Sequence, residues 1–257
     1  MPLMLSDPVF VLLTTVAVIL IGISKGGFAG GLSMLSVPLL SLQVDPRLAV
    51  AVTLPLLCVT DAFTVWAYRF KWHAGHLRVL MLGGLVGVAV GALTFDYVSE
   101  AAMRLIVGAS GLALMAVGLV LPRLVAPRKT RPSLGEGGVW GALAGFTSFT
   151  AHAGGPPAQL YLLSRDLDRT TYQATVTALF TAINVMKVGP YIWLGQLNRE
   201  VLLTAACFAP LAAASVWFGW WVHKRIDERL FYAVANGLLV ATCLKLSYDG
   251  ATSLMRG

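Results

Sequence analysis

Among the ionisable side chains within otherwise apolar stretches of this sequence, the best candidates for chemistry are Lys25, Asp61, His152 and Lys187. A lysine inside a membrane costs about 3 kcal/mol unless it meets water, an acid or an anion. Lys25 lies in a glycine-rich break, where backbone N–H groups freed at a helix end also favour an anion. The residues therefore predict an anion site. The alternative is that Lys25 reaches a lipid headgroup or pairs with an acid.

His152 occupies the place in the second half of the sequence that Lys25 occupies in the first, and it stands beside a matching Ala-Gly-Gly motif. An imidazole can donate to an anion and titrates near neutral pH. We therefore predict His152 as the proton carrier, with Asp61 as a second proton-coupling group. In this interpretation His152 takes a proton on the outer side and releases it inside, which drives export. The alternative is a hydrogen-bonded packing histidine.

Polar residues follow one face of the apolar stretch 171–194, namely Gln173, Thr177, Thr181, Asn184 and Lys187. Successive helical residues turn by about 100°, so these side chains share one stripe. The equivalent stretch 47–66 repeats the pattern with Thr53, Thr60, Asp61 and Thr64. Such faces either wall a shared cavity or supply hydrogen bonds between helices, each worth about 0.6 kcal/mol. The pattern leaves both readings open.

Composition decides the class of protein. Hydrophobic residues make up 57% of the chain and charged residues only 12%, which excludes a soluble globular protein. The net charge of +7 is spread over short loops and forms no basic patch with aromatic residues, so nucleic-acid binding is not expected. The three cysteines lie in apolar stretches without paired spacing, so no metal site or cofactor is predicted. We predict an all-α polytopic protein of the lipid bilayer.

Six stretches are long enough to cross about 30 Å of hydrocarbon as helices: 47–66, 77–97, 101–121, 171–194, 201–221 and 229–248. A glycine-rich broken-helix hairpin precedes each group of three, at 22–41 and 145–164, and is either re-entrant or formed by two short crossings. The stretch between the groups is rich in charge, proline and glycine, as linkers are. We therefore predict a single membrane domain, 1–257, divided into a first repeat, 1–121, a cytoplasmic linker, 122–138, and a second repeat, 139–257.

Loop charge predicts the orientation of these halves, because Lys and Arg favour the cytoplasmic side. Most basic residues fall in loops at 69–78, 123–131, 165–169 and 224–229, whereas the opposite ends hold Arg47, Arg104, Arg199 and Arg256. If each hairpin enters and leaves on one side, the two halves are inverted repeats. Inverted halves with helices broken at matching glycines are typical of secondary transporters with a midplane site and alternating access.

The motifs AGGLSMLSVPLL at 29–40 and AGGPPAQLYLL at 153–163, the turn at 45–47 and the duplicated layout resemble the TauE/SafE family of sulfite and organosulfonate exporters. The resemblance spans nearly the whole chain. It implies a proton-linked carrier of the bacterial cytoplasmic membrane that exports sulfite or an organosulfonate such as sulfoacetate. The second hairpin lacks the Val-Pro-Leu ending of the first, so we expect the two arms to contact different parts of the substrate.

We expect the two hairpin tips to meet around the small anionic substrate, with Lys25 and Lys187 supplying positive charge. Rocking of one repeat against the other would expose this site to each face in turn. Backbone N–H groups and polar side chains complete the predicted substrate-binding set: Gly26, Gly27, Gly30, Gly31, Gly154, Gly155, Thr53, His152, Thr177 and Asn184.

Several alternatives stay open at this point. The substrate is another small anion, such as a carboxylate, sulfate or thiosulfate; the direction is import; or the coupling ion is Na⁺ in place of H⁺. Homodimer formation is open as well. A membrane-embedded enzyme is the distant alternative, because His-Glu-x-x-His and Gly-x-Ser-x-Gly motifs are absent and Asp61 has no second intramembrane acid. We therefore expect no enzymatic activity.

Overall fold

The computed structural model describes residues 3–27, 31–124, 131–223 and 228–256, and every regular element within them is a helix. Short 3-10 turns lie at η1 (Leu3–Ser6), η2 (Gly31–Leu35) and η3 (Phe95–Tyr97). The helices are, in chain order, α1 (Pro8–Gly27), α2 (Ser36–Leu40), α3 (Pro46–Ala67), α4 (Ala74–Thr94), α5 (Glu100–Leu124), α6 (Leu134–Ala151), α7 (Gly155–Leu163), α8 (Arg169–Trp193), α9 (Arg199–His223) and α10 (Glu228–Arg256).

Helix length and hydropathy confirm the prediction of an all-α membrane protein. Four helices in the described segments are long and apolar enough to cross a membrane, at Pro8–Gly26, Pro46–Ala67, Ala74–Tyr97 and Arg199–Gly219. The six predicted crossings coincide with the long helices α3, α4, α5, α8, α9 and α10. The first hairpin arm, α1, has 20 residues and so reaches about 30 Å. The second arms are short, because α2 has 5 residues and α7 has 9.

Both ends of the predicted linker 122–138 lie within helices, because α5 continues to Leu124 and α6 begins at Leu134. Gly137 and Gly138 favoured a loop in the sequence, yet both lie inside α6. A β-carbon on Gly83 of α4 would lie 2.0 Å from the carbonyl oxygen of Gly138. Gly83 therefore allows α4 and α6 to approach closely here, whereas Gly137 and Gly138 continue the helix and do not turn the chain.

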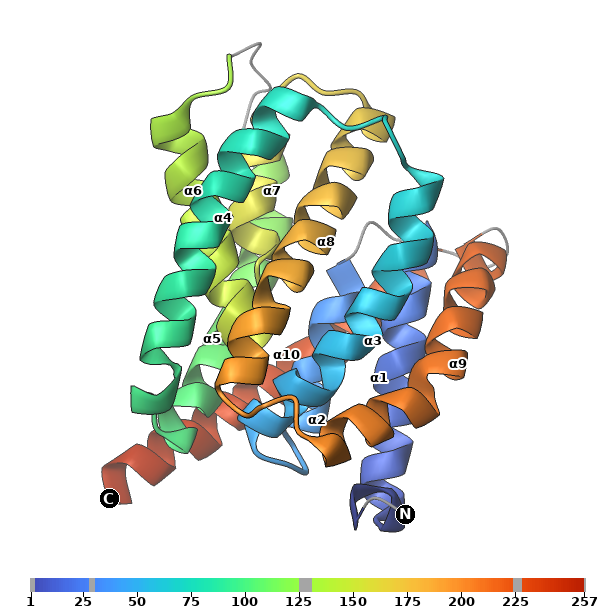
Figure 1. Ribbon diagram of the computed structural model, residues 1–257, viewed down its shortest axis with the longest axis vertical. Coiled ribbons are helices and arrows are strands. Elements are labelled where there is room, and N and C mark those ends of the chain that lie inside the picture. The colour runs from blue at the N-terminus through green and yellow to red at the C-terminus, as the bar shows by residue number, and fades with distance from the viewer. Residues whose placement is uncertain (1–2, 28–30, 125–130, 224–227, 257) are drawn as a thin grey trace.

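The long helices form one bundle in which α3 and α8 lie in the middle (Figure 1). Helices α4 and α6 flank them on one side, and α1 and α9 flank them on the other. The loop from α3 to α4 and the loop from α7 to α8 lie at the upper end in Figure 1. The loop from α8 to α9, the start of α1 and the end of α10 lie at the lower end.

Each hairpin packs against a long helix of the other half: α6 runs along α4, and α1 runs along α9. A β-carbon on Gly87 would lie 2.0 Å from the carbonyl oxygen of Ala142, and one on Gly219 would lie 2.5 Å from the α-carbon of Ile23. Both contacts thus depend on glycine in the long helix. Small residues of this kind let membrane helices approach at backbone distance. Each half therefore completes the packing of the other.

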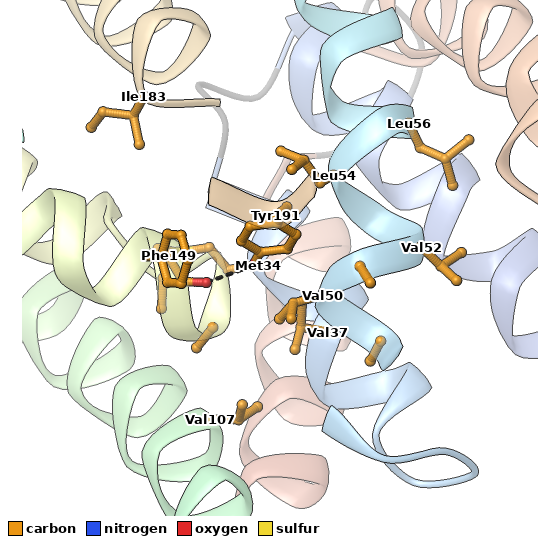
Figure 2. Close-up of a cluster of buried hydrophobic side chains, with 14 of the residues drawn as sticks. Met34, Val37, Val50, Val52, Leu54, Leu56, Val107, Phe149, Ile183 and Tyr191 are labelled. Atoms are coloured by element: carbon orange, nitrogen blue, oxygen red, sulfur yellow. Dashed lines mark hydrogen bonds between the residues drawn. The ribbon is translucent and has the colours of Figure 1, made fainter. Parts of the chain in front are cut away.

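A cluster of buried apolar side chains joins α3, α6 and α8 near the middle of the bundle (Figure 2). The Tyr191 hydroxyl of α8 donates to the carbonyl oxygen of Phe149 in α6 at 2.6 Å. The rings of these two residues also meet edge to face, with centroids 4.9 Å apart. These contacts fix the last turn of α6 against α8, directly before His152.

The two central helices begin with the same device, an aspartate at the N-cap. The Asp45 side chain accepts from the backbone N–H of Arg47 at 2.7 Å, and Asp168 accepts from the N–H groups of Thr170 and Thr171 at 3.0 Å each. Hydrogen bonds from the Thr171 side chain and then from these N–H groups lower the pKa of Asp168. Such caps satisfy N–H groups that have no partner within a helix.

Candidate functional site

A cavity of about 50 Å³ lies between the hairpins and the central helices. One buried water needs roughly 10–15 Å³ by this measure, so the cavity holds about four water-sized groups. Its walls come from α1, η2, α3, α6, α7 and α8, and thus from both halves of the chain. The lining residues are Lys25, Ser33, Met34, Leu57, Ser148, His152, Gly155, Gln159, Gln173, Val176, Thr177, Phe180 and Asn184.

The first lysine of the site forms an ion pair with a carboxylate. Lys25 Nζ contacts Asp61 Oδ1, with side chains 9% and 2% exposed. The other carboxylate oxygen, Oδ2, accepts from Asn184 Nδ2 at 2.7 Å. Lys25 lies in the last turn of α1, where the helix dipole favours a cation. Asp61 therefore holds two cavity-lining donors, one from each half.

The second lysine contacts neutral groups instead. Lys187 is 0% exposed, and its Nζ donates to the carbonyl oxygen and the Oγ of Ser148 at 3.0 Å each. Its third contact is His152 Nδ1 at 2.7 Å. Within the described segments Lys187 takes part in no ion pair. The positive charge of its ammonium form is therefore left without a contacting carboxylate.

His152 ends α6 with a left-handed backbone, at φ 50°. Non-glycine residues adopt this conformation uncommonly, although histidine is among those enriched in it. The turn directs Nε2 to the carbonyl oxygen of Val50 in α3 at 3.0 Å. A carbonyl oxygen only accepts, so Nε2 carries the hydrogen and Nδ1 has a lone pair for Lys187. His152 thus connects the cavity, α3 and Lys187.

The structure brings some predicted residues together and places others elsewhere. Lys25, His152, Gly155, Thr177 and Asn184 line the cavity, with Lys187 and Asp61 buried next to them. The hydroxyl of Thr53 is buried and donates to Ala49 of its own helix at 2.7 Å. The remaining predicted positions are glycines: Gly26 and Gly27 close α1, Gly31 opens η2, Gly154 precedes α7, and Gly30 lies outside the described residues.

The second hairpin offers fewer backbone donors than its glycine pair suggests. Of the first three residues of α7, Pro156 and Pro157 have no N–H. The next N–H, that of Ala158, donates to the carbonyl oxygen of Gly154 at 3.4 Å. Gly155 is thus the one N–H donor among these first three residues. Side chains make most of the polar lining in this half.

Ser148 and Gln159 line the cavity but were not predicted as site residues from the sequence. Ser148 lies four residues before His152, which places both on one face of α6. That spacing, beside a candidate proton carrier, is a signal that would have found Ser148. Gln159 stands alone on the nine-residue α7, and no periodic pattern points to it.

Comparison with known proteins agrees with this architecture. The family model described as "Sulfite exporter TauE/SafE" matches residues 14–246, which include both hairpins and the whole cavity lining. The protein named probable sulfite/organosulfonate exporter TauE, from Cupriavidus necator, is 24% identical over 217 residues, which cover 83% of this chain and 84% of that protein. No solved structure matches the chain. The chain therefore belongs to the TauE/SafE sulfite exporter family of membrane transporters.

Proposed function

We propose that this protein is a secondary transporter that exports a small sulfur oxyanion, either sulfite or an organosulfonate such as sulfoacetate, across the bacterial cytoplasmic membrane. The family and the name of the relative support this class of substrate. The observation that carries the proposal is the charge at the cavity. Among the described residues around it, Lys25 is matched by Asp61 whereas Lys187 has no contacting acid. An anion would supply the missing negative charge.

The size and lining of the cavity support a compact oxyanion. Room for about four water-sized groups suits an ion built from one sulfur and its oxygens. The lining residues Lys25, Asn184, Gln159 and Thr177 carry N–H or O–H donors that an oxyanion can accept from. The apolar remainder of the wall, which includes Phe180, suits the methylene group of a small organosulfonate.

We propose that residues 1–121 and 139–257 are inverted repeats that rock against each other around this cavity. The packing of each hairpin helix on a long helix of the other half supports this arrangement. The contact of α1 with α9 is the counterpart of the contact of α6 with α4. The sites of secondary transporters lie at such repeat interfaces. The loops 69–73 and 165–168 lie at one end of the bundle, and Arg69, Lys71, Arg165 and the adjoining Arg169 support a cytoplasmic position for that end (Figure 1).

The membrane potential supplies a driving force for export. It is worth about 2.3 kcal/mol per elementary charge per 100 mV, and a cell interior that is negative expels anions. We propose H⁺ as the coupling ion, with His152 at the point of entry from the cavity. Proton coupling then adjusts how many charges leave in each cycle.

Ligand-induced thermal stabilisation of the purified protein tests the substrate class. Sulfite, sulfoacetate and sulfate are compared with Mg²⁺, in the wild type and in Lys187→Met. The control is Lys245→Met, which removes an equal charge from a side chain that is 59% exposed and paired with Asp249. We expect a sulfur oxyanion to raise the melting temperature of the wild type and the control, and not that of Lys187→Met. Stabilisation by Mg²⁺ alone, or by no anion, would contradict the proposal.

A further inference from the structure

Lys187 reaches the cavity through two residues of α6. Its own side chain is fully buried, whereas Ser148 and His152, which contact its Nζ, both line the cavity. A proton that arrives from the cavity therefore reaches Lys187 past Ser148 and His152. These three residues are named the proton unit below.

The contacts of the proton unit satisfy the ammonium form of Lys187. Its three hydrogens point to three acceptors: the carbonyl oxygen of Ser148, the Oγ of Ser148 and Nδ1 of His152. Nδ1 is free to accept because Nε2 holds the imidazole hydrogen against the carbonyl oxygen of Val50. The unit then carries one positive charge.

The same contacts also satisfy the neutral amine. Its two hydrogens point to the Ser148 carbonyl and to His152 Nδ1, and its lone pair accepts from the Ser148 hydroxyl after that hydroxyl rotates. A proton can thus leave without any change in packing. A second proton does not fit, because an Nδ1–H would face the ammonium with no acceptor between them. The unit therefore holds one proton or none.

The ionisable groups around the unit leave its charge to be balanced from the cavity. Helix α3 contributes Asp61, whose carboxylate is shared by Lys25 of α1 and Asn184, and also Cys58. Helix α8 contributes Tyr191, which stays neutral while it donates to Phe149. In this part of the described structure, the one carboxylate is thus already paired. An anion in the cavity is the counter-charge that favours the protonated unit.

We propose that Lys187, His152 and Ser148 take up a single proton when the anion binds, so that proton and anion cross the membrane together. The proposal rests on the proposed function and names the proton site within it. Linkage requires that the proton tighten anion binding by the same factor as the anion tightens proton binding. This reverses the exchange that the sequence suggested for His152. A doubly charged anion leaving with one proton carries one net negative charge outward, which the membrane potential favours.

Proton uptake on anion binding tests this inference. Sulfoacetate is used because its own charge is fixed near neutral pH, and a pH-indicator dye in weakly buffered solution reports protons taken up by the purified protein. Isothermal titration then gives the affinity between about pH 6 and about pH 9. At pH values where the free unit has lost its proton, we expect about one proton to be taken up per bound anion and the affinity to fall about tenfold per pH unit. At lower pH, where the free unit already holds its proton, we expect no uptake and a constant affinity.

Two variants at one position separate charge from proton exchange. Lys187→Arg keeps a charge that cannot be lost, so we expect anion binding without proton uptake and with an affinity independent of pH. Lys187→Met removes both the charge and the uptake. Lys245→Met is the charge-matched control and should behave as the wild type, since it lies on an exposed face. Melting curves check that each variant is folded.

The outcomes distinguish the inference from the proposed function. If the wild type binds the anion and takes up no proton anywhere in this pH range, or releases one, the inference is wrong and the transport proposal stands. If the wild type binds no sulfur oxyanion at any pH, the proposed function fails as well. If Lys187→Arg does not fold, the test rests on Lys187→Met. Proton uptake retained by Lys187→Met would overturn the inference.

Discussion

The two halves of the molecule pack alike but carry charge differently. In each half a hairpin helix lies on a long helix of the other half, and glycines in the long helix allow the approach. At the cavity, however, the lysine from the first hairpin has a carboxylate partner, whereas the lysine on α8 has a carbonyl, a hydroxyl and an imidazole. The two halves therefore have the same helix packing, but the contacts of their lysines at the cavity differ.

This difference in contacts supports the proposal that the two lysines have separate tasks. Lys25, held by Asp61, belongs to a neutral pair that positions donors from both halves. In the proposed function, Lys187 contributes the positive charge that the anion balances.

The largest expected effect separates the lysines by stability. Lys25→Met leaves the buried Asp61 unpaired, which should cost about 3–5 kcal/mol of unfolding free energy. Lys187→Met should remain within about 1 kcal/mol of the wild type, because removing a buried charge offsets the lost hydrogen bonds. Denaturant titration in detergent measures both. Equal losses of unfolding free energy in the two variants would contradict the difference between the lysines. Adding Asp61→Leu to Lys25→Met should restore most of the stability, because it removes the unpaired carboxylate.

The next effect tests the shared scaffold. Gly87→Ala in α4 and Gly219→Ala in α9 each place a β-carbon against the backbone of a hairpin helix, so each should lose about 1–3 kcal/mol. Gly189→Ala is the control, since a β-carbon there has open space. Melting temperatures report the result. A lower melting temperature in only one of the two variants would contradict the equivalence of the α4–α6 and α1–α9 contacts.

A smaller effect concerns the two buried histidines. His152→Asn keeps a residue that tolerates the left-handed turn but removes the contact with Lys187. Anion affinity at about pH 6 should fall about tenfold, or about 1.4 kcal/mol. His76→Asn, whose histidine contacts Tyr161 at 2.8 Å away from the cavity, should leave affinity unchanged. Isothermal titration compares the two, and equal affinities in both variants would remove His152 from the proton unit.

The smallest effect concerns the helix caps. Asp168→Ala should lower the melting temperature slightly, because the first turn of α8 loses a charged acceptor. Hydrogen bonds lower the pKa of Asp168 in the fold, so its contribution is complete above the unfolded pKa and is lost as the pH falls through the folded pKa. The gap between variant and wild type should therefore close from about pH 5 toward about pH 2. Thermal melting across that range measures it.

The elements could be predicted from sequence because their signals are local. Apolar length gives the long helices, and the 3.6-residue period places Gln173, Thr177 and Asn184 on the face that lines the cavity. Partner choice is not local. Nothing along the chain says that Asp61 pairs with Lys25 and not with Lys187, or that Thr53 bonds its own helix. Glycines are ambiguous as well, since the same residue that ends a helix also permits close packing.

The packing of each hairpin helix on the other half determines when these contacts can form during synthesis. When α4 has been synthesised, its glycine face lacks the helix on which it packs in the folded protein, because α6 comes later in the chain. In the same way, α1 lacks its partner α9 until most of the chain has been synthesised. The first half is therefore an unfinished intermediate that the second half completes, and neither half expressed alone should reach a folded state.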